Sequence, residues 1–96
     1  MKSRRAISQL KNRKNQSNII AERLRQARDN HVPVFSAERL VQEILAKQDL
    51  DLDVGIVHKI ENQLRGAQDY EVAAFAKALG VSSDWLLGLN EVGGPR

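Results

Sequence analysis

Apolar residues recur three and four positions apart along most of the chain, which is the spacing that places side chains on one face of a helix. The first stripe predicts a helix that starts near Ser17 or Asn18 and stops by Asn30. Its inner face would consist of Ile20, Leu24 and Ala27. The next segment, 31–35, cannot be helical because Pro33 biases the residue before it toward extended geometry.

Two more helices follow, separated by an acidic turn. Ser36 is the expected N-cap of the second helix. The apolar face of this helix would consist of Leu40, Val41, Ile44 and Leu45. The run Asp-Leu-Asp-Leu-Asp at 49–53 changes the period to two, which predicts a turn with both leucines pointing inward. Asp53 can cap the third helix, where the helix dipole also favours a carboxylate. The inner face of the third helix would consist of Val57, Ile60 and Leu64.

Glycines mark the expected ends of the later helices. Gly66 is the expected left-handed stop of the third helix, and Gly80 is that of a fourth helix, which Asp69 opens. The fourth helix would bury Val72, Phe75, Ala76 and Leu79. Ser82 is the expected cap of a fifth, short helix. The inward residues of this helix would be Trp85 and Leu86. Because no segment is a convincing strand, the predicted fold class is all-α.

The charge is distributed unevenly over the 96 residues, which suffice for one small domain. Residues 1–18 hold six basic side chains and no acid, whereas 9 Lys and Arg face 12 Asp and Glu in the rest, so an arm of +6 precedes a body of −3. The basic side chains of the arm are Lys2, Arg4, Arg5, Lys11, Arg13 and Lys14. We expect a basic arm at 1–18, a folded domain at 19–89 and a flexible tail at 90–96. The arm could follow phosphates or enter a minor groove, or it could be a solvated tail.

The composition disfavours several function classes. Without cysteine, the chain has no disulfide, thiolate metal site or cysteine nucleophile. We expect no catalytic site, because His31 and His58 are distant in sequence and no nucleophile or carboxylate pair accompanies them. The acidic run at 49–53 lacks the glycine and the last glutamate of a calcium loop. No apolar run approaches about 18 residues and no signal-peptide pattern is present, so we expect a cytoplasmic protein without metal or cofactor.

Four stretches of the sequence stand in an order typical of one group of proteins. They are RLRQAR at 23–28, the segment 36–45, IVHKIEN at 56–62 and AKALGVSSDWLL at 76–87. Together they resemble the lambda-repressor-like helix-turn-helix family, of the phage repressor, Cro and xenobiotic-response-element class. The likeness covers roughly residues 19–89 and implies a five-helix DNA-binding domain, of the variant with a longer turn between helices 2 and 3, here 47–52.

The resemblance implies a mode of DNA binding, in which the second helix lies across the backbone and the third enters the major groove. The base-facing positions it implies are Val54, Gly55 and Lys59. The phosphate-facing positions it implies are Ala37, Asn62 and Arg65, in addition to the basic side chains of the arm. It further implies a structural salt bridge between Arg28 and Glu61. The predicted function is a DNA-binding transcriptional regulator with double-stranded DNA as its partner.

Three features depart from the pattern of the family. Ala37 and Gly55 stand where the family often has an amide or hydroxyl donor, and the aspartates of 49–53 would repel phosphates. Gln63 replaces the usual glycine, and we expect the helix to continue to Gly66, because this avoids a positive φ at a glutamine. The alternative function is a protein-interaction module that keeps the fold and has lost the residues that read DNA.

The fifth helix predicts a homodimer. It and the residues after it place more apolar surface together than one small core readily covers. This surface would consist of Trp85, Leu86, Leu87 and Leu89. Repressor-type operators are also usually paired half-sites, which suit a protein with two-fold symmetry.

Overall fold

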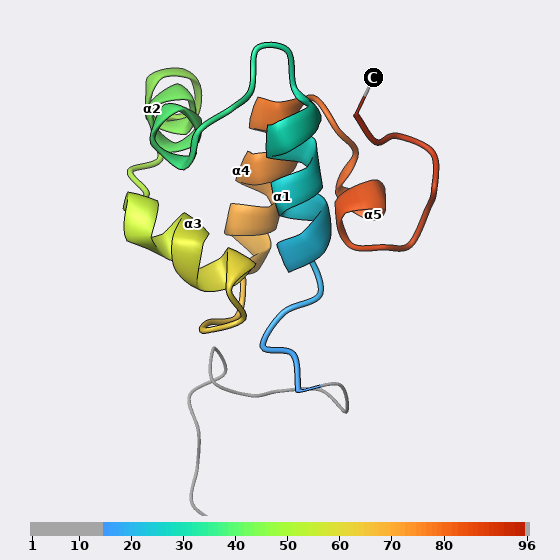
Figure 1. Cartoon of the computed structure of the whole chain (residues 1–96). Coiled ribbons are helices and arrows are strands. Elements are labelled where there is room, and N and C mark those ends of the chain that lie inside the picture. The colour runs from blue at the N-terminus through green and yellow to red at the C-terminus, as the bar shows by residue number, and fades with distance from the viewer. Residues whose placement is uncertain (1–14, 96) are drawn as a thin grey trace, which may run out of the picture.

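The computed structural model describes residues 15–95. Within that range the chain forms five helices and no strand, so the predicted all-α class is confirmed (Figure 1). The helices in chain order are α1 (Ala21–Asn30), α2 (Ala37–Gln48), α3 (Val54–Glu61), α4 (Asp69–Leu79) and α5 (Ser83–Leu86). The six basic side chains of the arm lie outside the described residues.

Helix α4 contacts most of the other helices. It packs against α1, α2 and α5, whereas α3 packs against α1 and α2. Figure 1 shows α2 and α3 on one side of α1 and α4, and α5 on the other side. The stripes that predicted the helices supply the core, which is formed mainly by Leu24, Leu40, Ile44, Val57, Ile60, Phe75, Leu79, Trp85 and Leu86. The helical spacing therefore identified most of the buried side chains.

Side-chain and backbone caps define the helix ends. Ser36, Asp53 and Ser82 each accept a backbone N–H bond at 3.0, 3.1 and 3.0 Å, as predicted for the starts of α2, α3 and α5. Gly80 ends α4 in the left-handed conformation, with φ of 70°. At the start of α1, the side-chain oxygen of Asn18 accepts two backbone N–H bonds, at 3.1 and 2.9 Å. These local interactions account for the observed boundaries.

Two leucines that were predicted to face inward do not. Leu45 is 46% exposed and Leu64 is 70% exposed. Leu45 directly follows the fully buried Ile44, and one residue of helix rotates the side chain by about 100° away from the core. Leu64 lies beyond the end of α3, after the left-handed residue Gln63, where the backbone no longer follows the helical stripe.

The end of α3 also differs from the prediction. The helix ends at Glu61, and the left-handed residue after it is Gln63, with φ of 61°, rather than Gly66. A left-handed residue other than glycine costs roughly 1 to 2 kcal/mol. The cost is offset because Gln63 accepts hydrogen bonds from Ser17 and Asn18, which lie far away in sequence.

Residues 90–95, which belong to the segment predicted to be a flexible tail, contact α1 and α5. The backbone N–H of Ser82 donates to the carbonyl oxygen of Gly93 at 2.9 Å. The guanidinium of Arg23 binds the carboxylate of Glu91 at 2.8 and 2.9 Å and lies 4.9 Å from the ring centre of Trp85. The folded body therefore extends beyond the predicted limits of 19 and 89 at both ends.

Gly94→Ala should loosen the C-terminal segment. A Cβ atom at this residue would lie 2.6 Å from two atoms of the Trp85 indole, so the segment would have to move. We expect a loss of stability of about 1 kcal/mol, and a red shift of the tryptophan emission as water reaches the ring. Trp85 is the only tryptophan of the chain, so the emission comes from this side chain alone. Val92→Ala, at an exposed position of the same segment, is the control and should leave the emission unchanged.

Candidate nucleic-acid interface

Helix α3 presents an outer face to solvent. Its inner side chains, Val57 and Ile60, are fully buried, and the helix packs against α1 and α2. Among the predicted base-facing positions, Lys59 is exposed, and Val54 and Gly55 are half-buried at the start of the helix. Lys59 is thus the position of the three that has a long, charged donor on the outer face.

The turn before α3 is anchored by leucine and exposes carboxylates. Leu52 is buried and Leu50 packs partly against the core, in agreement with the predicted inward leucines. Asp49, Asp51 and Asp53 are exposed, and Asp53 also caps α3. In water, each carboxylate would repel a phosphate about 4 Å away by about 1 kcal/mol. The beginning of α3 is therefore the more acidic end of this surface.

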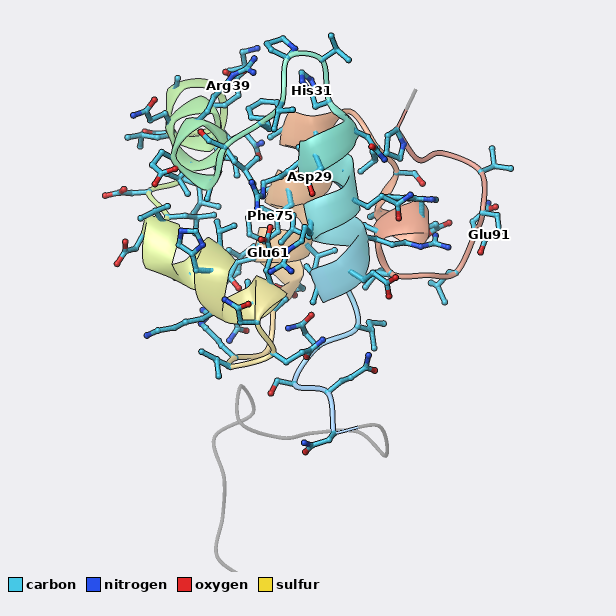
Figure 2. The ribbon with its side chains drawn as sticks, in the orientation of Figure 1. Asp29, His31, Arg39, Glu61, Phe75 and Glu91 are labelled. Atoms are coloured by element: carbon cyan, nitrogen blue, oxygen red, sulfur yellow. The ribbon has the colours of Figure 1, made fainter. Side chains whose placement is uncertain are left out.

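An ion pair fixes α3 against α1. Nε and Nη2 of Arg28 donate to the two carboxylate oxygens of Glu61, both at 2.7 Å, and Figure 2 shows Glu61 between the two helices. The side chains are 12% and 2% exposed. The hydrogen bond to Glu61 raises the pKa of Arg28. Nη1 of Arg28 also donates to the carbonyl oxygen of Phe35 at 2.8 Å. This pair, which the family resemblance implied, holds α3 in a fixed position on the body.

Arg65, which was expected to face a phosphate, instead forms an ion pair within the protein. Its guanidinium donates to both carboxylate oxygens of Glu71, at 2.8 and 2.9 Å, and to the carbonyl oxygen of Gly66 at 2.8 Å. The hydrogen bond to Glu71 raises the pKa of Arg65. Glu71 is also the last member of a capping box that starts at Gln68. The three-residue spacing of the capping box could have identified the structural role of Glu71 in the sequence.

The two other phosphate-facing positions have different surroundings. Ala37 is buried at the first position of α2, so only its backbone N–H could contact a phosphate. Asn62 is exposed after α3, and its side-chain oxygen accepts a bond from Nη2 of Arg25 at 3.3 Å. The side chain of Arg25 is half exposed and adds a positive charge beside the end of α3, which the sequence analysis did not identify.

The root of the arm, Ser17 and Asn18, lies beside the end of α3. The side-chain oxygen of Gln63 accepts the backbone N–H bonds of both root residues, at 2.9 and 3.1 Å. The side-chain nitrogen of Asn18 donates to the carbonyl oxygens of Ile60 and Arg65, at 2.8 and 2.9 Å. The strongly basic part of the chain is therefore attached to the body next to α3.

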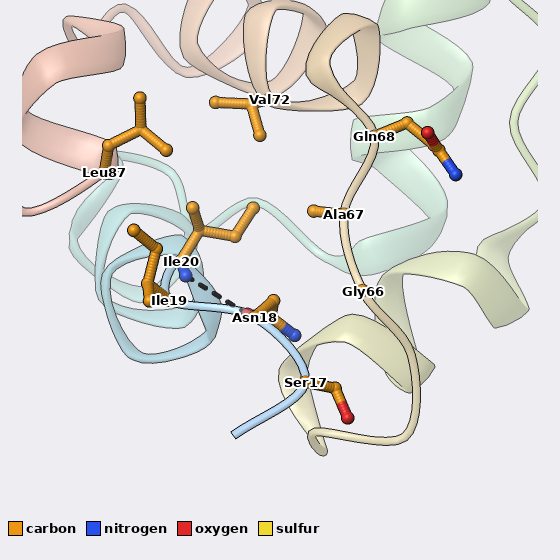
Figure 3. Close-up of a pocket in the computed structure, with 9 residues that line it drawn as sticks. All are labelled: Ser17, Asn18, Ile19, Ile20, Gly66, Ala67, Gln68, Val72 and Leu87. Atoms are coloured by element: carbon orange, nitrogen blue, oxygen red, sulfur yellow. Dashed lines mark hydrogen bonds between the residues drawn. The ribbon is translucent and has the colours of Figure 1, made fainter. Parts of the chain in front are cut away.

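A hollow of about 240 Å³ separates the residues around the root from the connection between α3 and α4 (Figure 3). Its wall is formed by the segment 17–20 on one side and the segment 66–68 on the other, together with Val72 and Leu87. This volume is below the range of about 300 to 1,000 Å³ that is usual for small-molecule sites. The hydrogen bonds that hold Ser17 and Asn18 to the end of α3 lie at the rim of this hollow.

The apolar surface predicted for a homodimer is mostly used inside the protomer. Trp85 and Leu86 are buried, and Leu87 packs partly against the core. Leu89 is 74% exposed. The homodimer stays a prediction, but of the four residues that suggested it only Leu89 offers a largely free side chain.

The chain matches no protein-family model, no curated protein and no solved structure. Within residues 15–95, no three His, Asp or Glu side chains lie close enough together to hold a metal ion. Over the same residues, no helix is both long and apolar enough to cross a membrane. The function must therefore be inferred from the residues and geometry of the surface around α3.

Proposed function

We propose that this protein is a DNA-binding transcriptional regulator with a lambda-repressor-like helix-turn-helix fold, in which α3 enters the major groove of double-stranded DNA. The observation that supports this most is the place of the arm root. A chain with six basic side chains joins the body at the end of α3, whose outer face is open to solvent. One surface thus combines an exposed helix with a strong source of positive charge.

The way α3 is held also favours groove binding. A major groove about 12 Å wide admits one helix, provided that the helix stands out from the body and keeps its orientation. Here the Arg28–Glu61 pair and the buried Val57 and Ile60 fix the inner side, which leaves Lys59 free to reach base edges. The half-buried Val54 and Ile56 could contact the methyl groups of thymine.

The charge distribution favours different roles for the arm and the body in DNA binding. The body from residue 19 onward carries −3, so phosphates would not attract it as a whole. The arm carries +6 and can supply the electrostatic affinity, either along the phosphates or in the minor groove. Base selection would then belong to α3 and general affinity to the arm. A cytoplasmic location and operation as a homodimer are parts of the same proposal.

Lys59→Ala should weaken specific binding by about 1 to 3 kcal/mol and relax the preference at one base pair, because Lys59 is the predicted base-facing residue that can reach O6 and N7 of guanine. The measurement is a comparison of duplexes that differ at single positions. Lys77→Ala is the matched control, since it removes the same charge from an exposed position of α4. If the two variants bind every duplex equally well, α3 does not read the groove through Lys59.

The proposal as a whole is tested by selecting duplexes from a random pool and measuring their electrophoretic shift at two salt concentrations. We expect an enriched sequence and binding that weakens steeply with salt. Exposed aspartates before α3 and the internal pairing of Arg65 favour the alternative, a protein-interaction module with the same fold. No enrichment and no shift at low salt would support that alternative.

A further inference from the structure

We propose that Gln63 is a positioning residue that fixes where the arm leaves the body, and that it thereby determines how many arm cations reach the phosphates beside α3. This inference rests on the proposed DNA-binding function and adds a residue to it. Gln63 does not itself contact a base or a phosphate in this proposal. Its role is to hold the arm root in one position.

Gln63 holds the root through both its side chain and its backbone. The side-chain oxygen accepts from the N–H groups of Ser17 and Asn18 at 2.9 and 3.1 Å, and the carbonyl oxygen accepts from the hydroxyl of Ser17 at 2.9 Å. Gln63 therefore accepts three hydrogen bonds, which fix two consecutive residues of the arm. The direction of the chain at Ser17 is set by this contact.

The neighbouring bonds show that the side chain of Gln63 is not needed to end α3. The backbone N–H of Asn62 donates to His58, and that of Leu64 donates to the carbonyl oxygen of Lys59 at 2.8 Å. The left-handed turn at Gln63 is a conformation that glycine adopts without strain. A glycine at this position would keep the turn and remove only the side-chain bonds to the root, so the contribution particular to glutamine is the clamp on Ser17 and Asn18.

The clamp matters for DNA binding because of the reach of the arm. Lys14, Arg13 and Lys11 are the three cations nearest to Ser17, at most six residues away along the chain. Six residues span no more than about 20 Å when fully extended. With a fixed origin next to α3, these cations are confined to a volume near the bound duplex. Without the Gln63 side chain, the root is held less closely, through the hydroxyl of Ser17 and the side chain of Asn18, and the effective concentration of the arm cations at the phosphates falls.

The test compares binding of one selected duplex by four full-length proteins: the unaltered chain, Gln63→Gly, an arm-neutral variant, and the combination of both changes. In the arm-neutral variant, glutamine replaces Lys2, Arg4, Arg5, Lys11, Arg13 and Lys14. With the native arm, Gln63→Gly should lower affinity about 3- to 10-fold, which corresponds to the usual cost of ordering a released segment. In the arm-neutral protein the same substitution should change affinity less than about 2-fold.

The salt dependence provides a second measurement that a purely structural role would not change. Gln63→Gly should reduce the slope of log affinity against log salt by about 0.9 for each phosphate contact that the arm loses. Ser17→Ala removes the hydroxyl bond from the other side of the clamp and should have a smaller effect in the same direction. Leu64→Ala is the control, because its side chain is exposed and takes no part in the clamp. Thermal unfolding should show that Gln63→Gly has a stability close to that of the unaltered chain, because the substitution removes both the strain of the left-handed conformation and the two side-chain bonds that offset it.

The outcomes separate this inference from the proposed function. An equal loss of affinity with the native and the neutral arm would mean that Gln63 acts on α3 and not on the arm, and would overturn the inference alone. The inference alone would also be overturned if the unaltered chain and Gln63→Gly bind the duplex with the same affinity and the same salt slope. A failure of the unaltered chain to bind any duplex would overturn the proposed function and the inference together.

Discussion

Duplex binding by the arm-neutral variant should be weaker than that of the unaltered chain by on the order of 10³-fold at 0.1 M salt. If about four of the six arm cations meet phosphates, the slope of log affinity against log salt becomes shallower by about 3.6, at roughly 0.9 per phosphate. The loss is large because the rest of the chain carries −3 and offers no compensating attraction. The measurement is a titration of one duplex at several salt concentrations with both proteins.

Sequence preference should survive this change better than affinity does, since phosphate contacts carry little information about the bases. A variant with the residues 1–14 in scrambled order is the matched control, because it keeps all six charges and should retain most of the salt slope. The substitutions leave Ser17 and Asn18 in place, so the cap of α1 is not disturbed. Identical slopes for the unaltered and neutral arms would favour the protein-interaction alternative.

Ile60→Ala should cost about 2 to 5 kcal/mol of stability, through lost burial and the cavity that remains. Ile60 is fully buried on the inner side of α3, where its carbonyl oxygen also accepts a bond from Asn18. A small domain is stabilised by only about 5 to 15 kcal/mol in total. Each kcal/mol lowers the melting temperature of such a domain by about 4 to 8 °C, so we expect a decrease of at least about 8 °C.

Leu64→Ala provides the contrast for this prediction. The sequence pattern places Leu64 on the same stripe as Ile60, but the structure leaves it 70% exposed. Its substitution should change stability by no more than about 0.5 kcal/mol. Chemical denaturation of both variants distinguishes the two positions, and equal destabilisation would show that Leu64 is part of the core.

The features that the sequence predicted well are those with local causes. Ser36, Asp53 and Ser82 cap helices through bonds to residues two or three positions away. Gly80 ends α4 because glycine adopts the left-handed conformation without strain. The stripes of buried residues follow from helical geometry in the same way. The exposure of Leu64 could not be predicted, because it depends on where α3 ends.

The left-handed glutamine that follows α3 makes contacts across the chain, which the local pattern does not contain. Gln63 adopts the left-handed conformation in a protein whose residues 17 and 18 donate to it, more than forty positions away in sequence. The pairing of Arg65 with Glu71 could not be predicted either, since a basic residue after the third helix is equally compatible with a phosphate partner. Of the candidate surface, the sequence predicted α3 and the exposed Lys59. It did not point to Arg25, and the left-handed residue expected at Gly66 is Gln63 instead.

The bonds of Arg28 have a consequence for the dynamics of the body. Its guanidinium joins the carboxylate of Glu61 to the carbonyl oxygen of Phe35, and the backbone N–H of Phe35 in turn donates to the carbonyl oxygen of Arg28 at 3.0 Å. Phe35 lies just before the cap of α2, so one side chain connects the end of α3 with the beginning of α2. The amide protons of these two helices should therefore exchange with solvent through a shared cooperative opening, in which neither helix detaches without the other.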